Sequence, residues 1–301
     1  MLPRPVEDAL YAVIKSIGRR VSKFAVVGER PDYWVIDTEA DDVSVIVKLA
    51  GPNAIEPLFA DAAAPHRVAE RLTSLPLASI LASDDSCSMV PFRYMVKTRI
   101  EGEPWFLRRT KLSETEKSTA LAAIGEAVAE LHQPTFPTFG SFEPDGAVLP
   151  VALLTALKAR AELRIRSSRL RHLFLEVLAR RSDVFVADER AGINHDDLHG
   201  YNILFDPIEP TRVATILDFD KGWCGPIEND LAKMELWTGM TGPAFMAAYR
   251  AVHPQAPGYD DRRPVYQLFW CLEYAEPSPE HLAITNALCR ELRLHEISNF
   301  S

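Results

Sequence analysis

The sequence has few cysteines, no long apolar run and no excess of basic residues. Its four cysteines, Cys87, Cys224, Cys271 and Cys289, include no CxxC pair, so neither a disulfide framework nor a cysteine zinc site is expected. It shows no signal peptide and no apolar stretch of spanning length, and we therefore expect a cytoplasmic protein without a membrane partner. The net charge of −9 argues against a nucleic-acid partner and is compatible with a cationic small molecule.

A hairpin that carries polar residues is expected in the second half of the chain. Residues 213–217 form a short apolar run with β-branched side chains, which predicts a strand that ends at Asp218. A second short strand is expected at 203–205, followed by a turn at Asp206 and Pro207. Antiparallel strands joined by a short loop lie side by side, so the residues that flank them come together.

This hairpin is expected to bring three oxygen-bearing side chains, Asp197, Asn202 and Asp218, to one small volume. Oxygen ligands suit a hard cation such as Mg²⁺, which is held by one or two protein groups and completed by phosphates and water. A nucleotide is the natural second component of such a site. The spacing of Asp197 and Asn202 also matches the catalytic loop of kinases, in which the aspartate accepts the hydroxyl proton and the asparagine holds metal.

The stretch 195–202, His-Asp-Asp-Leu-His-Gly-Tyr-Asn, resembles the His-Gly-Asp-Leu-His-x-x-Asn loop of aminoglycoside phosphotransferases and their choline-kinase-like relatives. Leu217 to Asp220 resembles the metal-binding segment of that family, and Asp230-Leu231-Ala232 matches its next landmark. The resemblance implies that Asp197 is the catalytic base and that Asn202 and Asp218 bind Mg²⁺ with ATP or GTP. It also implies loop-supporting roles for His195, His199, Asp220 and Asp230. One departure is Asp196, where the family usually has glycine.

Three other interpretations fit parts of the same stretch. Asp and Asn side chains often only cap their own turns. His195, Asp197 and His199 are chemically suitable zinc ligands for a metal hydrolase, although no further ligand cluster follows them. Asp218 and Asp220 end a hydrophobic strand, as in phosphatases with an aspartyl nucleophile, but the sequence after Asp220 predicts helices rather than βα units.

Length and periodicity predict two lobes. A chain of 301 residues exceeds the usual single-domain size. A helix is expected at 6–18, followed by three strands at 22–27, 33–37 and 43–49. With the resemblance, this pattern predicts an α+β, protein-kinase-like fold with a small antiparallel β lobe plus one helix at 1–102. A larger, mostly helical lobe is expected at 103–301, and the turn from Gly28 to Asp32 would cover the phosphates.

Lys48 is the only lysine of the third expected strand. It stands where a kinase lysine meets the α- and β-phosphates of the nucleotide. In kinases that lysine pairs with a helix glutamate, and the expected helix at 58–72 offers Asp61 and Glu70. We choose Glu70 as the partner of Lys48 in the nucleotide site.

The hinge between the lobes is expected at 97–102, after a strand that begins near Phe92. In the family, adenine bonds the backbone of the hinge, which implies nucleotide contacts near Thr98 and Ile100. Lys97 occupies the place of the usual apolar gatekeeper, so the choice between ATP and GTP stays open.

The remainder of the chain predicts helices, including one at 114–132 in which His132 is a structural contact. Arginines between 160 and 171 predict a solvated helix face. Beyond Asp230, acidic and aromatic residues are mixed, and carboxylates beside aromatic rings bind ammonium groups. The acidic residues that we assign to acceptor binding are Asp260, Asp261, Glu273 and Glu276.

By this resemblance, the expected reaction is transfer of the γ-phosphate of ATP or GTP to a hydroxyl of a small molecule. An aminoglycoside-like, cationic antibiotic is the first expectation for the acceptor. The alternative is a metabolic kinase for an amino alcohol, an amino acid or a sugar, which the same loop would serve equally. A catalytically inactive nucleotide-binding protein is a third hypothesis, because Asp196 and Lys97 depart from the family pattern.

Overall fold

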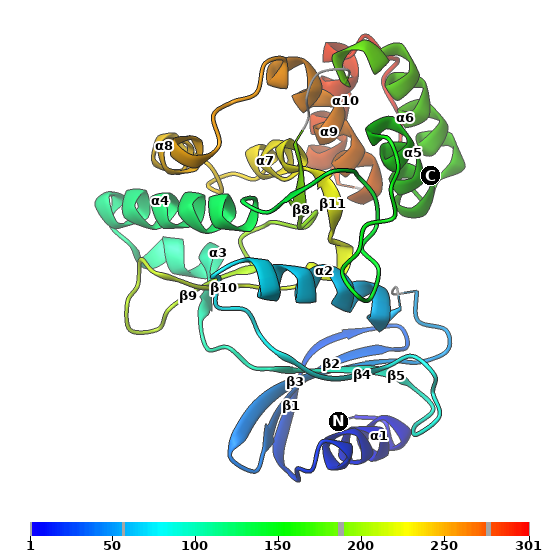
Figure 1. Ribbon diagram of the computed structural model, residues 1–301, viewed down its shortest axis with the longest axis vertical. Helices are drawn as coiled ribbons and strands as arrows, with labels where there is room; N and C mark the ends of the chain where they lie inside the picture. Colours follow the sequence, from blue (N-terminus) through cyan, green and yellow to red (C-terminus); the bar gives the residue numbers. More distant parts are fainter. Residues whose placement is uncertain (1, 56–57, 186–189, 275–277, 301) are drawn as a thin grey trace.

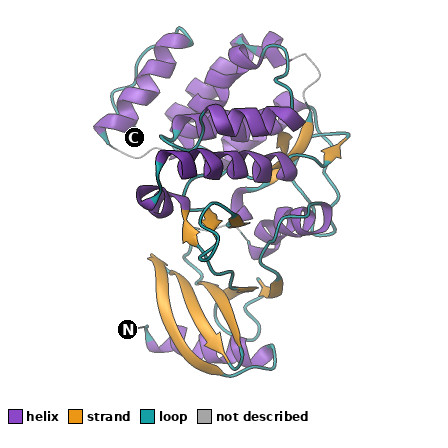
Figure 2. Cartoon of the chain, turned by 90° about the vertical axis from the view of Figure 1, so that its left-hand side faces the viewer, coloured by secondary structure: helices purple, strands orange, loops and turns teal. Residues whose placement is uncertain are grey.

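The computed structural model describes residues 2–55, 58–185, 190–274 and 278–300. A sheet stands at one end of the molecule and most helices gather at the other (Figures 1 and 2). The five strands of this sheet are antiparallel and lie in the order β1-β2-β3-β5-β4. They are β1 (Val21–Arg30), β2 (Tyr33–Ala40), β3 (Val43–Ala50), β4 (Ile80–Asp84) and β5 (Arg93–Thr98).

Successive side chains of a strand point to opposite faces of the sheet, and here both faces carry apolar side chains. A helix therefore covers each face. Helix α1 (Arg4–Ser16) packs against the face that carries Trp34, Ile36 and Val96. Helix α2 (Phe59–Leu72) packs against the opposite face at Tyr33 and Met95, between the sheet and the helical part (Figure 1). The expected N-terminal helix and three-strand meander are therefore confirmed.

The first turn of the sheet differs from the expectation. Gly28 lies within β1, paired with Val35 of β2, so the predicted turn beginning at Gly28 is wrong. The chain reverses later, around Asp32, whose φ is +58°. The Asp32 carboxylate accepts the backbone N–H of Asn53 at 2.7 Å, which ties this turn to the end of β3. The strand continues past Gly28 because β1 and β2 keep pairing as far as Arg30 and Tyr33.

The larger part is mostly helical. Its helices are α3 (Trp105–Arg108), α4 (Glu114–Leu131), α5 (Leu153–Arg164), α6 (Ser168–Arg180), α7 (Ile227–Leu236), α8 (Pro243–Val252), α9 (Tyr259–Tyr274) and α10 (Pro279–Glu291). Three short 3-10 turns are η1 (Arg109–Lys111), η2 (Ser182–Phe185) and η3 (Phe219–Lys221). No helix of the described residues is long and apolar enough to cross a membrane.

Two small sheets connect these helices to the site. One has the order β10-β9-β6 and the other β11-β8-β7. Their strands are β6 (Glu103–Pro104), β7 (Thr135–Phe136), β8 (Ala191–Asn194), β9 (Ile203–Phe205), β10 (Val213–Ile216) and β11 (Trp223–Pro226). Helices α7 to α10 follow β11, without the βα units that the phosphatase interpretation needs.

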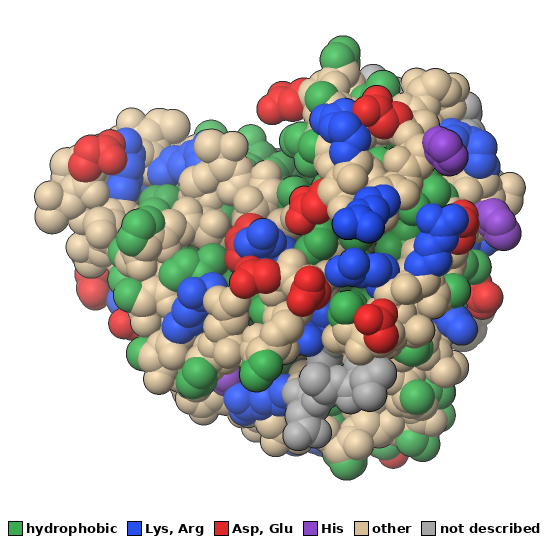
Figure 3. All heavy atoms as spheres, turned by 90° about the horizontal axis from the view of Figure 1, so that it is seen from above, with side chains coloured by type: hydrophobic (Ala, Val, Ile, Leu, Met, Phe, Trp, Pro, Cys, Tyr) green, Lys and Arg blue, Asp and Glu red, His purple; other side chains and the backbone are tan. Residues whose placement is uncertain are grey.

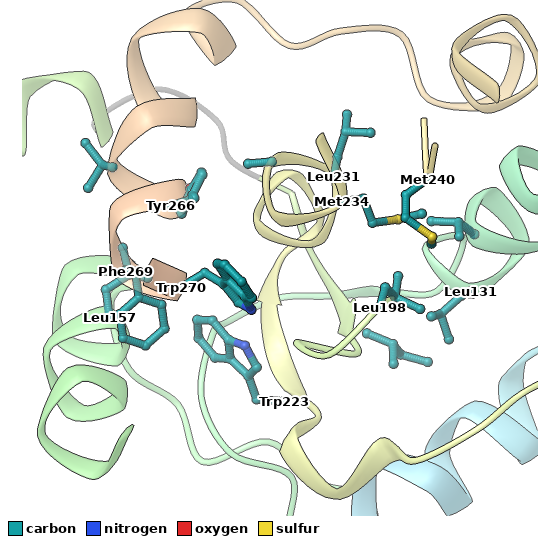
Figure 4. Packing of buried hydrophobic residues seen from close by; sticks show 14 of the residues in the cluster. Leu131, Leu157, Leu198, Trp223, Leu231, Met234, Met240, Tyr266, Phe269 and Trp270 are labelled. Carbon is teal, nitrogen blue, oxygen red and sulfur yellow. The ribbon is translucent and has the colours of Figure 1, made fainter. Parts of the chain in front are cut away.

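The core of the helical part also holds the loop between β8 and β9. Leu198 of this loop is buried among the same side chains as Leu131 and Met240 (Figure 4). Burying a leucine side chain contributes about 1.5–3 kcal/mol. The loop is therefore fastened to the core of the helical part by its apolar side chain.

Candidate active site

The hairpin of β9 and β10 brings Asn202 beside Asp218. Ile203 pairs with Ile216 in an antiparallel register, and the backbone N–H of Leu217 donates to the carbonyl of Asn202 at 2.7 Å. Asn202 precedes β9 and Asp218 follows β10, so both lie at the same end of the hairpin. This is the juxtaposition that the sequence predicts.

Asp230, at the start of α7, holds the preceding loop by its backbone. Its fully buried carboxylate accepts the N–H of His195 at 2.6 Å and that of Asp196 at 2.7 Å. His132 lies 3.2 Å from the same carboxylate and bonds the hydroxyl of Tyr249 on its other side at 2.8 Å. These contacts agree with a supporting role for Asp230, and they confirm His132 as a structural contact.

The histidines of the loop are used in local hydrogen bonds. The N–H of Asp197 donates to Nδ1 of His195 at 3.3 Å, so Nε2 carries the proton and donates to the Leu217 carbonyl at 2.8 Å. His199 accepts the N–H of Tyr201 at 3.2 Å. In the described ranges no three His, Cys, Asp or Glu side chains converge as metal ligands. The arrangement therefore speaks against a zinc site at His195, Asp197 and His199.

Asp197 lies beside a lysine that the sequence did not single out. Its Oδ1 lies 3.1 Å from Nζ of Lys221, and the aspartate side chain is 21% exposed. Burial would lower the pKa of Lys221, but Glu273 and Asp197 outweigh burial and raise that pKa above its ordinary value. Lys221 is thus a permanent cation that orients the Asp197 carboxylate.

Lys48 reaches across from β3 to the residues after β10. Its Nζ lies 2.6 Å from a carboxylate oxygen of Asp218 and 2.6 Å from one of Asp220. Burial would lower the pKa of Lys48, but the two carboxylates outweigh it and raise the pKa well above its ordinary value. Burial would raise the pKa of Asp218, but Lys48 holds it far below its usual range. Burial and the Asp218 charge raise the pKa of Asp220.

Glu70 does not pair with Lys48, so that prediction is wrong. Glu70 is exposed and accepts a hydrogen bond from the Ser79 hydroxyl at 2.8 Å. The α2 residue that faces the cluster is His66, whose ring lies 5.3 Å from that of Phe219. Burial, with Lys97 nearby, lowers the pKa of His66 to about 3, so its ring is neutral. The negative charge beside Lys48 therefore comes from Asp218 and Asp220 and not from helix α2.

The side chains that could hold Mg²⁺ present suitable oxygens. Asn202 donates its amide nitrogen to the Asp197 carbonyl at 3.0 Å, which leaves its amide oxygen for a ligand. Asp218 sits at φ +65°, a left-handed conformation that turns the chain sharply at this point. Amide and carboxylate oxygens are the donor set that Mg²⁺ takes beside nucleotide phosphates, so the residues fit the ion.

Asp196 is folded into the loop rather than exposed in the cleft. Its φ is +66°, which accounts for a glycine at this place in similar loops. The buried carboxylate binds Arg160 of α5 and Lys233 of α7, and accepts the amide of Asn229 at 2.7 Å. Burial would raise the pKa of Asp196, but Lys233 and Arg160 hold it far below its usual range.

The residues at the expected hinge differ in whether their backbone N–H groups are already hydrogen-bonded. Thr98 donates its N–H to the Ser79 carbonyl at 2.9 Å, so this amide is already used. The amide of Ile100 has no backbone partner in the portion of the chain that is described. Lys97 is buried with Nζ 4.0 Å from Asp220. Burial and the Lys48 charge lower the pKa of Lys97.

The residues assigned to a cationic acceptor are not brought together. Glu273 is buried and binds Arg164 through one oxygen at 2.9 and 2.7 Å, with Lys221 3.5 Å away. Asp260 and Asp261 line a separate hollow, 3.6 Å from Arg263 and 3.7 Å from Arg181. Glu276 lies outside the described residues. Charges of both signs also alternate on the face seen from above (Figure 3).

The prediction of a solvated arginine face is wrong for Arg160 and Arg164. Arg160 is 7% exposed and donates to the Lys221 carbonyl at 2.8 Å as well as to Asp196. The two arginines are four residues apart and share a helix face with the buried Leu157 and Ala161. That spacing was the signal in the sequence that these guanidinium groups face inward.

Known proteins resemble this chain in sequence and in structure. A "Probable ketoamine kinase" of Enterococcus faecium is 27% identical over 205 residues, covering 62% of this chain and 70% of the relative. One of Lactiplantibacillus plantarum is 39% identical over 80 residues, and the chain matches only 27% of that relative's length.

Among solved structures, aminoglycoside phosphotransferase APH(4)-Ia has a TM-score of 0.66 at 16% identity, covering 96% of this chain and 97% of its own. A protein of Haemophilus somnus proposed to be a fructosamine-3-kinase has a TM-score of 0.65 at 14% identity, covering 95% and 97%. These likenesses show a protein-kinase-like α+β fold, with an N-terminal antiparallel sheet and a larger helical part. The model of the phosphotransferase enzyme family matches residues 22–265. The chain therefore belongs to the phosphotransferase enzyme family of small-molecule kinases.

Proposed function

We propose that this kinase transfers the γ-phosphate of ATP or GTP to a hydroxyl of a ketoamine, a sugar-derived metabolite that carries an amine. The observation that carries the proposal is the alignment of 205 residues with a protein named as a ketoamine kinase. The aminoglycoside alternative has support from the fold alone, because its structural matches are 14–17% identical. The buried ion pairs of Glu273 also remove a carboxylate that a polycationic antibiotic would need.

The geometry supports a role for each group of the site. Asp197 would orient the acceptor hydroxyl and take its proton, with Lys221 holding the carboxylate in place. Asn202 and Asp218 would hold Mg²⁺, which supplies charge neutralisation at the phosphates. Lys48 would bind the phosphates, and the free N–H of Ile100 would meet the base. The division of the chain at residue 102, with the hinge at 97–102, remains a proposal.

Acceptor turnover is the direct test of this function. Purified protein with ATP and Mg²⁺ is expected to release ADP when a ketoamine of glucose is supplied, and to release little with kanamycin or hygromycin B. The ratio of kcat/KM between the two acceptor classes decides between the hypotheses. Turnover of the antibiotics alone would move the aminoglycoside interpretation ahead, and no turnover with any hydroxyl acceptor would favour an inactive nucleotide-binding protein.

The proposed metal site makes a separate prediction about binding. Asp218→Ala is expected to weaken the affinity for the magnesium complex of ATP more than Asn202→Ala, because it removes a full charge as well as a ligand. We expect a loss of about 10-fold or more for Asp218→Ala, on the order of 1.4 kcal/mol. Titration of each variant with a fluorescent ATP analogue, with and without Mg²⁺, measures the effect. Unchanged affinity in both variants would contradict the assignment.

A further inference from the structure

A large cleft opens beside Asp220 and Lys221, with a volume of about 1110 Å³. Lys221 forms part of its wall and lies 3.1 Å from Asp197, so the proposed base lies directly behind this part of the wall. The hinge residues 97–102 do not line it. The cleft therefore lies on the acceptor side of the phosphates, and its side chains describe what the acceptor must carry.

The wall of this cleft has more positive than negative groups. Its acidic side chains are Asp61, Glu143, Asp220 and Glu273. Its basic side chains are Arg30, Arg93, Arg160, Arg164, Arg166 and Lys221. Two of the acids are already bound by lysines from behind the wall, since Asp220 lies 2.6 Å from Lys48 and Glu273 lies 3.9 Å from Lys233. Arg160 and Lys221 are in turn held by Asp196 and Asp197, so the positive charge that this wall offers an acceptor comes chiefly from its other arginines.

Two arginines are placed differently within this wall. Arg164 is held by Glu273 through Nε and Nη2, which fixes the guanidinium at the cleft. Arg166, in the link between α5 and α6, is exposed and has no ion pair or side-chain hydrogen bond within the described residues. An unpaired guanidinium beside a fixed one suits a carboxylate or a phosphate, which accepts two N–H bonds at once.

We infer that the acceptor of this kinase carries a carboxylate or phosphate group, bound by Arg166 and Arg164 in the wall of the cleft. The stacked rings of Trp270 and Tyr274, 5.0 Å apart, line the same cleft and would cover the carbon skeleton of the acceptor. This inference rests on the proposed function and narrows its substrate class. A ketoamine formed on an amino acid satisfies it, because its carboxylate is several bonds away from the sugar hydroxyls.

The test uses three acceptors that differ in one group. They are the ketoamine that glucose forms with glycine, the ketoamine that glucose forms with methylamine, and the methylamine adduct of glucose 6-phosphate. The second lacks the anion, while the first and third carry a carboxylate and a phosphate. We expect kcat/KM to be about 10-fold or more higher for one of the anionic adducts, the size of one charge-assisted contact. The better of the two identifies the source of the charge.

Variants then connect the preference to the arginine. Arg166→Gln is expected to raise the KM of the preferred anionic acceptor by about 10-fold, with little effect on the KM of ATP. Arg250→Gln is the matched control, because this exposed arginine of α8 lies outside the cleft. Raised ionic strength should also increase the KM of the anionic acceptor more than that of the neutral one, since salt screens the wall.

The outcomes separate the inference from the function it rests on. Equal kcat/KM for all three adducts, or an equal loss on all three in Arg166→Gln, would overturn the anion site and leave the ketoamine kinase standing. A raised KM for ATP in Arg166→Gln would assign the arginine to the nucleotide and overturn the inference as well. If no ketoamine is phosphorylated, the proposed function itself fails.

Discussion

Asp197→Asn is expected to lower kcat by about 10²–10⁴-fold, which is what a positioned proton acceptor contributes. The amide has nearly the same shape as the carboxylate, so the loop held by Asp230 and Leu198 should keep its conformation. It cannot take a proton from the acceptor hydroxyl, and it replaces the charged partner that Lys221 has at 3.1 Å. The loss should therefore appear in kcat rather than in nucleotide binding.

Two measurements distinguish this role from a structural one. Steady-state ADP release gives kcat, and titration with a fluorescent nucleotide in the presence of Mg²⁺ gives the affinity for the donor. Asp8→Asn is the control, because this exposed aspartate lies on α1, on the outer face of the sheet. A variant at Asp197 that kept more than about half of the wild-type kcat, or one that lost nucleotide binding to the same extent as turnover, would contradict the assignment.

The parts of the site that sequence could predict are those fixed by short-range structure. Asn202 and Asp218 meet because the antiparallel pairing of β9 and β10 brings together the residues that flank the same end of the hairpin. Lys48 stands at the site because strands alternate their faces and the third strand carries a single lysine. Each inference needed only local periodicity and the spacing of a few polar residues.

The ion pairs of the site could not be predicted in the same way. Lys48 and Asp218 are 170 residues apart, and Arg160 and Asp196 are 36 apart. Whether a charged residue is solvated or buried against a partner depends on the packing of whole helices, which local spacing does not determine. Glu70 and Glu273 show the consequence. The sequence assigned Glu70 to the nucleotide site, but its side chain is exposed, and it assigned Glu273 to the acceptor, but its side chain is buried in an ion pair.

Asp196 is the residue at which a departure from the family pattern has the clearest structural meaning. Its carboxylate neutralises Arg160 and Lys233, two cations that are themselves buried. Lys233 also approaches Glu273 at 3.9 Å, so the loop, α5, α7 and α9 meet in one group of charges. Glycine at this place would suit the backbone and leave both cations without their shared partner. The Asp196 carboxylate therefore belongs to the buried group of charges. It does not add a negative charge to the cleft beside Asp197.

Asp196→Asn is expected to reduce the free energy of unfolding by about 3–5 kcal/mol, the cost of leaving a buried ion pair with one partner missing. Asparagine tolerates the left-handed backbone at φ +66° about as well as aspartate, so the change isolates the charge. Urea unfolding at neutral pH measures the loss. Adding Lys233→Met removes one of the two stranded cations and should restore part of the stability, giving a coupling energy of about 0.5–3 kcal/mol. A single variant within about 1 kcal/mol of the wild type would contradict a stabilising role.

The pH dependence of that difference checks its electrostatic origin. Lys233 and Arg160 outweigh burial and hold the pKa of Asp196 far below its usual range, which is near 3.9 when the chain is unfolded. A carboxyl with a depressed folded-state pKa contributes stability in full above its unfolded pKa and loses it as the pH falls toward the folded value. The difference between the wild type and Asp196→Asn should thus be constant above about pH 5 and shrink below about pH 4. A difference that stayed constant through the acid range would point instead to lost packing, because the side-chain volume, unlike the charge, does not change with pH.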